Sequence, residues 1–180
     1  RGIYMREIIT DRLVIRKFTE HDGEDLYEYF SNPKVLEFEP YKPYSREKSY
    51  IEAKRRAGDE RFLAVCLKSG KLIGNFYFAK EEFETWEVGY VFNDQYWGKG
   101  YATEGLLALM KYGFHELGVR RMIAMCDPQN PHSWKLLERV GMRREGTLLK
   151  NVYFFTDEDG NPIWKDTYEY GILKSEFHNQ

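Results

Sequence analysis

The chain has 180 residues, 42% of them hydrophobic and 31% charged, with a formal net charge of −2 at pH 7. This length and composition are typical of one soluble globular domain, and the nearly balanced charge argues against a nucleic-acid partner, which usually selects a basic surplus. No apolar run approaches the ~20 residues of a membrane span and no signal peptide opens the chain, so we expect a cytoplasmic protein without a membrane partner.

Periodic patterns of apolar residues predict the elements in chain order. Alternation of apolar and polar residues predicts strands at 8–17, 62–68, 72–79, 85–92, 120–126, about 142–155 and 163–173. Apolar stripes with helical spacing and capping residues predict helices at 22–30, 45–56, roughly 102–117 and 130–141. The order β-α-α-β-β-β-α-β-α-β-β indicates an α/β (mixed α+β) fold, with a mixed sheet of six to seven strands and helices on both faces. The two cysteines, Cys66 and Cys126, lie in strand-like runs, and we expect them to be reduced core thiols.

The stretch QYWGKGYATEG, residues 95–105, joins the strand 85–92 to the helix that follows it. Its glycines, Gly98 and Gly100, stand just before that helix, whose first N–H groups are unpaired and carry a partial positive charge. Glycines at this place let a phosphate approach the backbone closely, so the turn predicts a pyrophosphate site. The pattern is neither a P-loop nor a dinucleotide-binding fingerprint. The alternative is that the glycines serve only a tight strand-to-helix connection.

A combination of motifs carries a family resemblance. The pattern Q-x-x-G-x-G-x-A at 95–102 resembles the acetyl-CoA pyrophosphate loop of the GNAT N-acetyltransferases. The pattern N-x-x-S at 130–133, followed by GM at 141–142, resembles the second cofactor segment of that family. The combined form is similar to the RimJ/RimL-like branch, the ribosomal-protein N-acetyltransferase type. Because the resemblance covers about residues 6–176, we take that range as a single N-acetyltransferase domain and 1–5 as a cloning remnant or start region.

The resemblance implies that acetyl-CoA is the cofactor and that it lies in a cleft where the strands 85–92 and 120–126 splay apart. The pantetheine arm would bond to the backbone of the first of these strands, and the pyrophosphate to the amides of the turn. Lys99, Lys135 and Arg139 are candidates for the adenosine phosphates, or else solvated surface charges. The residues implied in cofactor binding are Val91, Phe92, Gln95, Trp97, Gly98, Lys99, Gly100, Tyr101, Ala102, Thr103, Asn130, Ser133 and Lys135.

The resemblance also implies the reaction, a direct attack of an amine on the thioester in a ternary complex, with no covalent intermediate and no metal. Such a reaction needs a neutral amine, a partner for the oxyanion and a proton for the leaving thiolate. Glu87 is the candidate general base, acting directly or through water, and its alternative is a solvent-facing or salt-bridged strand carboxylate. His132 is a second candidate base. A backbone N–H of the strand 85–92, such as that of Val91, would meet the oxyanion.

Ser133 is the candidate proton source for the thiolate. It shares a helix face with Leu136, Leu137 and Val140, so its hydroxyl needs a partner, which is either nearby backbone or the CoA sulfur. Many GNAT enzymes carry a Tyr at the position of Leu137, and this departure favours Ser133 or water as the acid. The family resemblance implies Asn130 as a hydrogen-bond partner of the cofactor arm, and a helix cap is its alternative or additional role.

The acceptor implied by the branch resemblance is a protein N-terminus. An α-amine, with a pKa of about 7.8, is neutral at pH 7 far more often than a Lys amine with a pKa of about 10.4. The alternatives are a small-molecule amine (polyamine, aminoglycoside or amino-acid-like), another acyl donor, or a non-catalytic acyl-CoA-binding module. No acidic cluster in the sequence marks a polyamine site. Several aromatic residues either line the acceptor pocket or pack in the core: Tyr27, Tyr29, Phe38, Tyr41, Tyr44, Tyr153 and Trp164.

Overall fold

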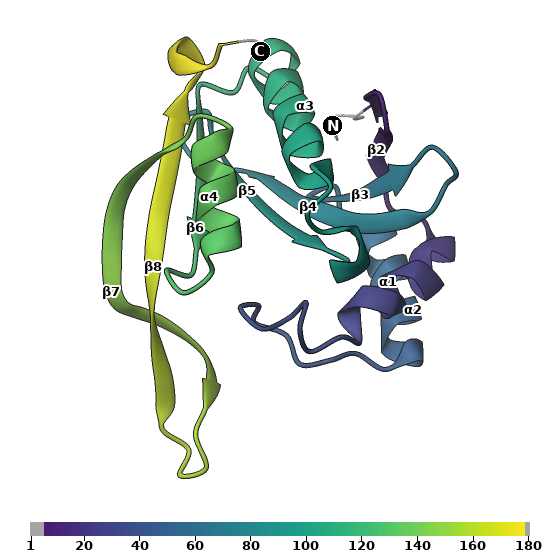
Figure 1. Cartoon of the computed structure of the whole chain (residues 1–180), viewed down its shortest axis with the longest axis vertical. Coiled ribbons are helices and arrows are strands. Elements are labelled where there is room, and N and C mark those ends of the chain that lie inside the picture. The colour runs from purple at the N-terminus through teal and green to yellow at the C-terminus, as the bar shows by residue number, and fades with distance from the viewer. Residues whose placement is uncertain (1–5, 179–180) are drawn as a thin grey trace.

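The computed structural model describes residues 6–178 (Figure 1). The strands are β1 Ile8–Ile9, β2 Leu13–Lys17, β3 Phe62–Leu67, β4 Leu72–Lys80, β5 Thr85–Phe92, β6 Arg121–Cys126, β7 Arg143–Thr156 and β8 Pro162–Leu173. The helices are α1 Gly23–Phe30, α2 Arg46–Ala57, α3 Tyr101–Glu116 and α4 Pro131–Arg139, with short 3-10 turns η1 Glu20–Asp22, η2 Asp94–Tyr96 and η3 Lys174–Glu176. Residues 1–5, the predicted remnant or start region, lie outside the described residues.

The strands form one sheet in the order β1-β2-β3-β4-β5-β6-β8-β7. All neighbours pair antiparallel except β5 and β6, which are parallel, as expected for a strand–turn–helix–strand unit. The predicted fold class is confirmed, but the described sheet has eight strands and not six to seven. The predicted strand 8–17 is broken because Thr10 and Leu13 close a tight turn. Thr10 N donates to Leu13 O at 3.0 Å, and Leu13 N donates to Thr10 Oγ1 at 2.9 Å.

Two apolar cores cover the two faces of the sheet. The helices α3 and α4 pack on one face, together with β5 side chains at even positions such as Val88 and Phe92. The helices α1 and α2 pack on the other face, where Val91 of β5 joins their core. The alternation predicted for β5 is therefore confirmed, and it directs the even-numbered side chains toward α3 and α4.

The parallel strands β5 and β6 separate along their length, as the resemblance implies. They pair only where Thr85–Glu87 faces Arg121–Ile123. Beyond this point β5 continues to Phe92 and β6 to Cys126 without pairing to each other. The helices α3 and α4 begin just after the carboxyl ends of these two strands, so both helix N-termini lie at the open end of the gap (Figure 1).

Two further expectations concern membrane helices and cysteines. Within residues 6–178, no helix combines the length and the apolar character that crossing a membrane requires. Cys66 is buried, Cys126 is half-buried, and both are free thiols. Burial raises the pKa of each thiol to about 11, so both remain neutral at pH 7.

Candidate functional site

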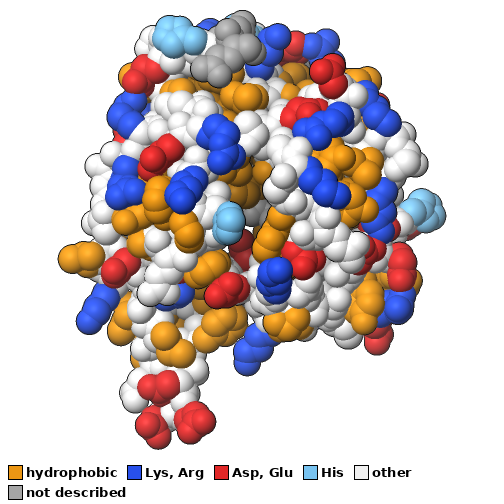
Figure 2. Space-filling model, viewed as in Figure 1, with side chains coloured by type: hydrophobic (Ala, Val, Ile, Leu, Met, Phe, Trp, Pro, Cys, Tyr) orange, Lys and Arg blue, Asp and Glu red, His pale blue; other side chains and the backbone are white. Residues whose placement is uncertain are grey.

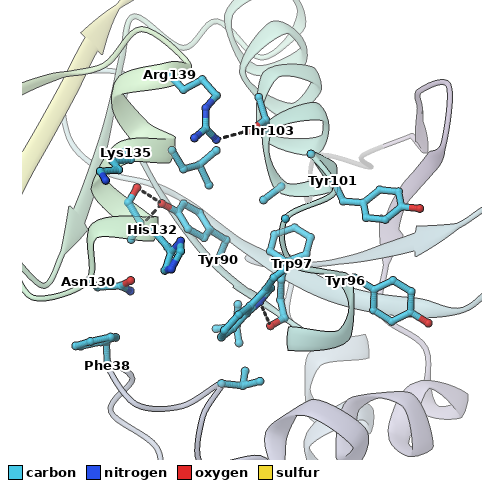
Figure 3. Close-up of a pocket in the computed structure, with 18 of the residues that line it drawn as sticks. Phe38, Tyr90, Tyr96, Trp97, Tyr101, Thr103, Asn130, His132, Lys135 and Arg139 are labelled. Carbon is cyan, nitrogen blue, oxygen red and sulfur yellow. Dashed lines mark hydrogen bonds between the residues drawn. The ribbon is translucent and has the colours of Figure 1, made fainter.

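A large cavity of about 1060 Å³ opens at the wide end of the gap between β5 and β6. Its walls are the end of β5, the turn before α3, the first turns of α3 and α4, and the connection between α1 and α2 (Figure 3). A small cavity of about 180 Å³ lies beside it and is also walled by β6, β7 and β8. The two cavities meet at a junction formed by the residues that line both: Phe38, Glu39, Tyr90, Asn130 and Ser133.

The turn before α3 has a backbone that favours glycine. Gly98 has φ 74° and Gly100 has φ 81°, in the left-handed region that residues with a Cβ avoid. A Cβ added at Gly98 would meet no atom within 4 Å, so conformation and not crowding sets the requirement there. Glu104 N donates to Gly100 O at 3.0 Å, as the first bond of the helix. The N–H groups of residues 101–103 therefore have no partner within α3 and are open to a ligand.

Most residues predicted to bind the cofactor line the large cavity: Val91, Phe92, Trp97, Gly98, Gly100, Tyr101, Ala102, Thr103, Asn130, Ser133 and Lys135. Arg139 and His132 line it as well. Gln95 and Lys99 are not among the lining residues. Gln95 is exposed on η2. The Lys99 carbonyl accepts a hydrogen bond from Arg12 Nη1 at 2.9 Å. The ammonium group of Lys99 lies 5.7 Å from the centre of the Tyr96 ring.

Basic side chains surround the N-terminus of α3. Four cationic residues line the large cavity: Arg12, Lys34, Lys135 and Arg139. Arg12 Nε lies 2.7 Å from Glu104 Oε1, and Arg139 Nη1 donates to Thr103 Oγ1 at 3.1 Å (Figure 3). The space-filling view shows Lys and Arg side chains on both sides of the hollow (Figure 2). Since Arg12 pairs with Glu104 and Lys34 lies 3.9 Å from Asp94, Lys135 and Arg139 are the lining cations without a carboxylate partner among the described ion pairs. Together with the helix dipole, their charge favours a polyanionic ligand.

The register of β5 decides which of its backbone groups reach the gap. Asn93 N donates to Ile73 O at 2.8 Å just beyond the end of β5, and hydrogen-bonded pairs alternate along antiparallel strands. The N–H of Val91, two residues earlier, therefore points toward β4. The prediction that this N–H meets the oxyanion is wrong, because it belongs to the β4 ladder. The N–H groups of Tyr90 and Phe92 point the opposite way, into the gap.

Two hydroxyl groups meet at the junction. Tyr90 Oη lies 2.8 Å from Ser133 Oγ and donates to Ser133 O at 3.1 Å (Figure 3). Burial raises the pKa of the Tyr90 phenol, and the Ser133 hydrogen bond opposes this shift. Leu137, at the position where many family members carry a Tyr, is fully buried in the core. Tyr90 of β5 thus brings a phenol to the cavity from a different element.

Asn130 lines both cavities. Its side chain makes no capping hydrogen bond to α4, so the expected role as a side-chain cap is wrong. Its backbone has φ −107° and ψ 79°, and the Asn130 carbonyl accepts the N–H groups of Ser133 and Trp134 at 3.1 and 3.3 Å. The amide of Asn130 is therefore available to a ligand.

Glu87 lines neither cavity. It lies opposite Ile123, where β5 and β6 are still paired, before the gap opens. Burial raises the pKa of its carboxyl, and the neighbouring carboxylate of Glu81 raises it further. This position argues against Glu87 as the base.

The carboxylate at the junction is Glu39, which no motif in the sequence marks. It follows Phe38 in the connection between α1 and α2 and lines both cavities. Burial raises the pKa of its carboxyl to about 7, while the charge of Arg56 opposes that shift. Among the residues predicted to form the acceptor pocket, Phe38 lines both cavities and the others line neither.

The small cavity is acidic. It is lined by the carboxylates of Glu39, Asp127 and Asp166 and by one cationic side chain, Lys165. Lys165 Nζ lies 2.7 Å from Asp127 Oδ2, so this lysine neutralises one of the three acids. The acids come from three separate parts of the chain. No acidic cluster is visible in the sequence for this reason, because these three carboxylates meet only through tertiary folding.

Comparison with known proteins agrees with this geometry. A family model described as an acetyltransferase (GNAT) domain matches residues 12–143. The uncharacterized N-acetyltransferase YnaD of Bacillus subtilis (strain 168) is 37% identical over 174 residues, covering 95% of this chain and 99% of YnaD. The crystal structure of a GNAT-family acetyltransferase from Bacillus anthracis is 38% identical with a TM-score of 0.86, covering 95% of this chain and 100% of that one.

A more distant relative carries an assigned substrate. The ribosomal protein uS5-alanine N-acetyltransferase of Escherichia coli (strain K12) is 25% identical over 158 residues, covering 77% of this chain and 79% of that enzyme. The family match spans more than half of the chain, and YnaD matches nearly its full length. The chain therefore belongs to the GNAT acetyltransferase family, as an N-acetyltransferase that uses acetyl-CoA.

Proposed function

We propose that the enzyme binds acetyl-CoA in the large cavity and transfers its acetyl group to a primary amine that enters through the small cavity. The observation that carries this proposal is the junction, where Tyr90, Ser133 and Glu39 line both cavities. Acetyl-CoA supplies an activated thioester when it is bound. The open N–H groups at the start of α3 and the basic side chains around them would hold its phosphates.

The same residues supply the groups that the reaction requires. The N–H of Tyr90 or Phe92 faces the gap and would stabilise the oxyanion that forms on the acetyl carbonyl. The hydroxyl of Ser133 or Tyr90 lies at the junction and would give a proton to the leaving thiolate. These roles replace those predicted for Val91 and Glu87, whose N–H and carboxylate do not reach the junction.

As first candidate for the acceptor we propose the α-amine of a protein, within the RimJ/RimL-like branch. The motif resemblance supports it, as does the similarity to an enzyme named for acetylating an alanine of a ribosomal protein. An α-amine also needs less deprotonation than a Lys amine, by about 2.6 pKa units or roughly 3.5 kcal/mol.

A second candidate is a small amine that carries another positive charge. The observation that favours it is the acidic small cavity, where only one of the three carboxylates is paired with Lys165. A cavity of about 180 Å³ is smaller than the usual drug-sized site, which suits a small molecule or the first residue of a peptide.

An amine panel tests the proposal and separates the two candidates. The assay follows release of the CoA thiol with a peptide that has a free N-terminal alanine, its N-acetylated form, 1,4-diaminobutane and 1-aminobutane. We expect turnover with the free peptide and none with the blocked one. Preference for the diamine over the monoamine by about tenfold or more would favour the second candidate instead. Absence of turnover with every amine contradicts the proposed function.

The basic wall gives a prediction on cofactor affinity. Lys135→Ala should weaken CoA binding about fivefold at low salt, because an exposed charge pair contributes up to ~1 kcal/mol. The difference should shrink at high ionic strength, since salt screens exposed charges. Lys111→Ala is the matched control, because Lys111 is exposed on α3 and does not line the cavity. Equal affinities of the two variants in a calorimetric titration would contradict this role of Lys135.

A further inference from the structure

We propose that Glu39 is the general base that accepts the proton of the attacking amine. The inference rests on the proposed function and deepens it, since it assigns the base at the junction of the same two cavities. It also moves the base from β5 to the connection between α1 and α2.

The position of Glu39 is the first argument. It lines the large cavity, where the thioester would lie, and the small cavity, through which the amine would enter. Phe38, the preceding residue, faces the cavity near Asn130 in the close-up (Figure 3). A base must lie within hydrogen-bond reach of the nitrogen that it deprotonates, directly or through one water. Of the described carboxylates, Glu39 is the one that lines both cavities.

The surroundings of Glu39 are the second argument. Burial raises the pKa of the Glu39 carboxyl, and no described group donates a hydrogen bond to it. The charge of Arg56, on α2, partly offsets the burial. The other titratable groups that line the two cavities are Arg12, Lys34, Glu37, Tyr90, Tyr96, Tyr101, Glu104, Cys126, Asp127, His132, Lys135, Arg139, Lys165 and Asp166. Lys165 Nζ lies 2.7 Å from Asp127 Oδ2, so this lysine forms its ion pair with Asp127 and not with Glu39.

The proton and electron balance is simple. The amine nitrogen forms a bond to the acetyl carbon, and one N–H proton passes to the Glu39 carboxylate. The carbon–sulfur bond breaks, its electron pair stays on sulfur, and the thiolate takes a proton from the Ser133 or Tyr90 hydroxyl. Before the next cycle Glu39 releases its proton to solvent and the deprotonated hydroxyl takes one up from solvent, so both groups return to their starting states.

The ionisation of the Glu39 carboxyl should make the rate of the reaction depend on pH. Burial raises the pKa of the Glu39 carboxyl to about 7. The carboxylate accepts a proton only when ionised, so kcat/KM should rise with pH through about 7, before the separate rise through the pKa of the amine substrate, about 7.8 for an α-amine. Loss of Glu39 should remove the first rise and keep the second.

The decisive comparison is Glu39→Gln against Glu87→Gln. Both changes replace a partly buried carboxylate with an isosteric amide, but only Glu39 lines the cavities. Glu39→Gln should lower kcat about 10²- to 10³-fold and remove the rise of kcat/KM near pH 7, since a positioned base contributes typically 10²–10⁴-fold. CoA affinity by calorimetry should stay within about twofold, and Glu39→Asp should regain part of the rate. Glu87→Gln should match the wild type.

A titration of the side-chain carboxyl signals by carbon NMR supplies a readout independent of turnover. A carboxyl that titrates near pH 7 should be present in the wild type and in Glu87→Gln, and absent in Glu39→Gln. If Glu39→Gln stays as active as the wild type, or no wild-type carboxyl titrates there, Glu39 is not the base. A wild type that releases no thiol with any amine contradicts the proposed function itself, which distinguishes the two failures.

Discussion

Replacing both glycines of the turn before α3 by valine should weaken CoA binding by about two orders of magnitude. Gly98 and Gly100 have φ 74° and 81°, and a residue with a Cβ costs roughly 1–2 kcal/mol in this region. Two such positions therefore disfavour the open conformation of the turn by about 2–4 kcal/mol, at tenfold in affinity per 1.4 kcal/mol. The measurement is a calorimetric titration of Gly98→Val/Gly100→Val with CoA.

The matched control introduces valine at two other glycines of positive φ that lie outside the site. Gly70 and Gly160 have φ 97° and 81°, and a Cβ at either would meet no atom within 4 Å. They lie in the β3–β4 and β7–β8 turns. The variant Gly70→Val/Gly160→Val should lose stability but keep its CoA affinity. Unchanged affinity in the Gly98/Gly100 variant, or an equal loss in the control, would contradict the role of the turn.

Removing the hydroxyls at the junction should slow the chemical step more than it weakens binding. Tyr90 Oη and Ser133 Oγ lie 2.8 Å apart, so each positions the other. We expect Ser133→Ala and Tyr90→Phe each to lower kcat by about 10- to 100-fold, at or below the usual range for acid catalysis because a thiolate is a moderate leaving group. The kcat of the double variant should be only slightly lower than that of the less active single variant, because two groups in contact act as a unit.

The control for this pair is Tyr153→Phe. Tyr153 lies on β7, is 46% exposed and lines neither cavity. Loss of its hydroxyl should leave kcat and KM unchanged in steady-state kinetics. Full activity of both Ser133→Ala and Tyr90→Phe would show that water protonates the thiolate.

The parts of the fold that follow from local patterns are predictable from the sequence. The alternation in 85–92, the paired glycines and the apolar stripe of the next helix together predict the β5–turn–α3–β6 unit, which is present. The interruption of the first strand is not predictable in this way. It depends on hydrogen bonds between Thr10 and Leu13, which the alternation of side chains does not report.

The same distinction between local patterns and tertiary contacts applies to the residues of the site. Its residues from 91–103 and 130–139 lie in contiguous motifs, and most of them line the large cavity. Arg12 and Glu39 reach the cavity only through tertiary folding and carry no local pattern. Glu87, the base predicted from the sequence, lies outside both cavities, because alternation gives the face of a strand but not the point where neighbouring strands separate.

The sequence also does not reveal which backbone N–H groups of β5 point into the gap, because this depends on the register of the sheet. The sequence places Val91 on β5, but its N–H direction depends on which pairs of the β4–β5 ladder are hydrogen-bonded. The hydrogen-bonded pairs are set by the pairing of β5 with β4, where Ile73 and its neighbours lie. Sequence patterns therefore predict the strand that would hold the cofactor, and the register of the sheet directs the N–H groups of Tyr90 and Phe92 into the gap, where we propose that they bind it.

The most direct test of the account is a crystal structure with CoA bound. We predict that its pyrophosphate accepts hydrogen bonds from the N–H groups of residues 98–103, and that its sulfur lies at the junction beside Ser133 and Tyr90. CoA seated outside the large cavity, or a sulfur remote from the junction, would contradict the account.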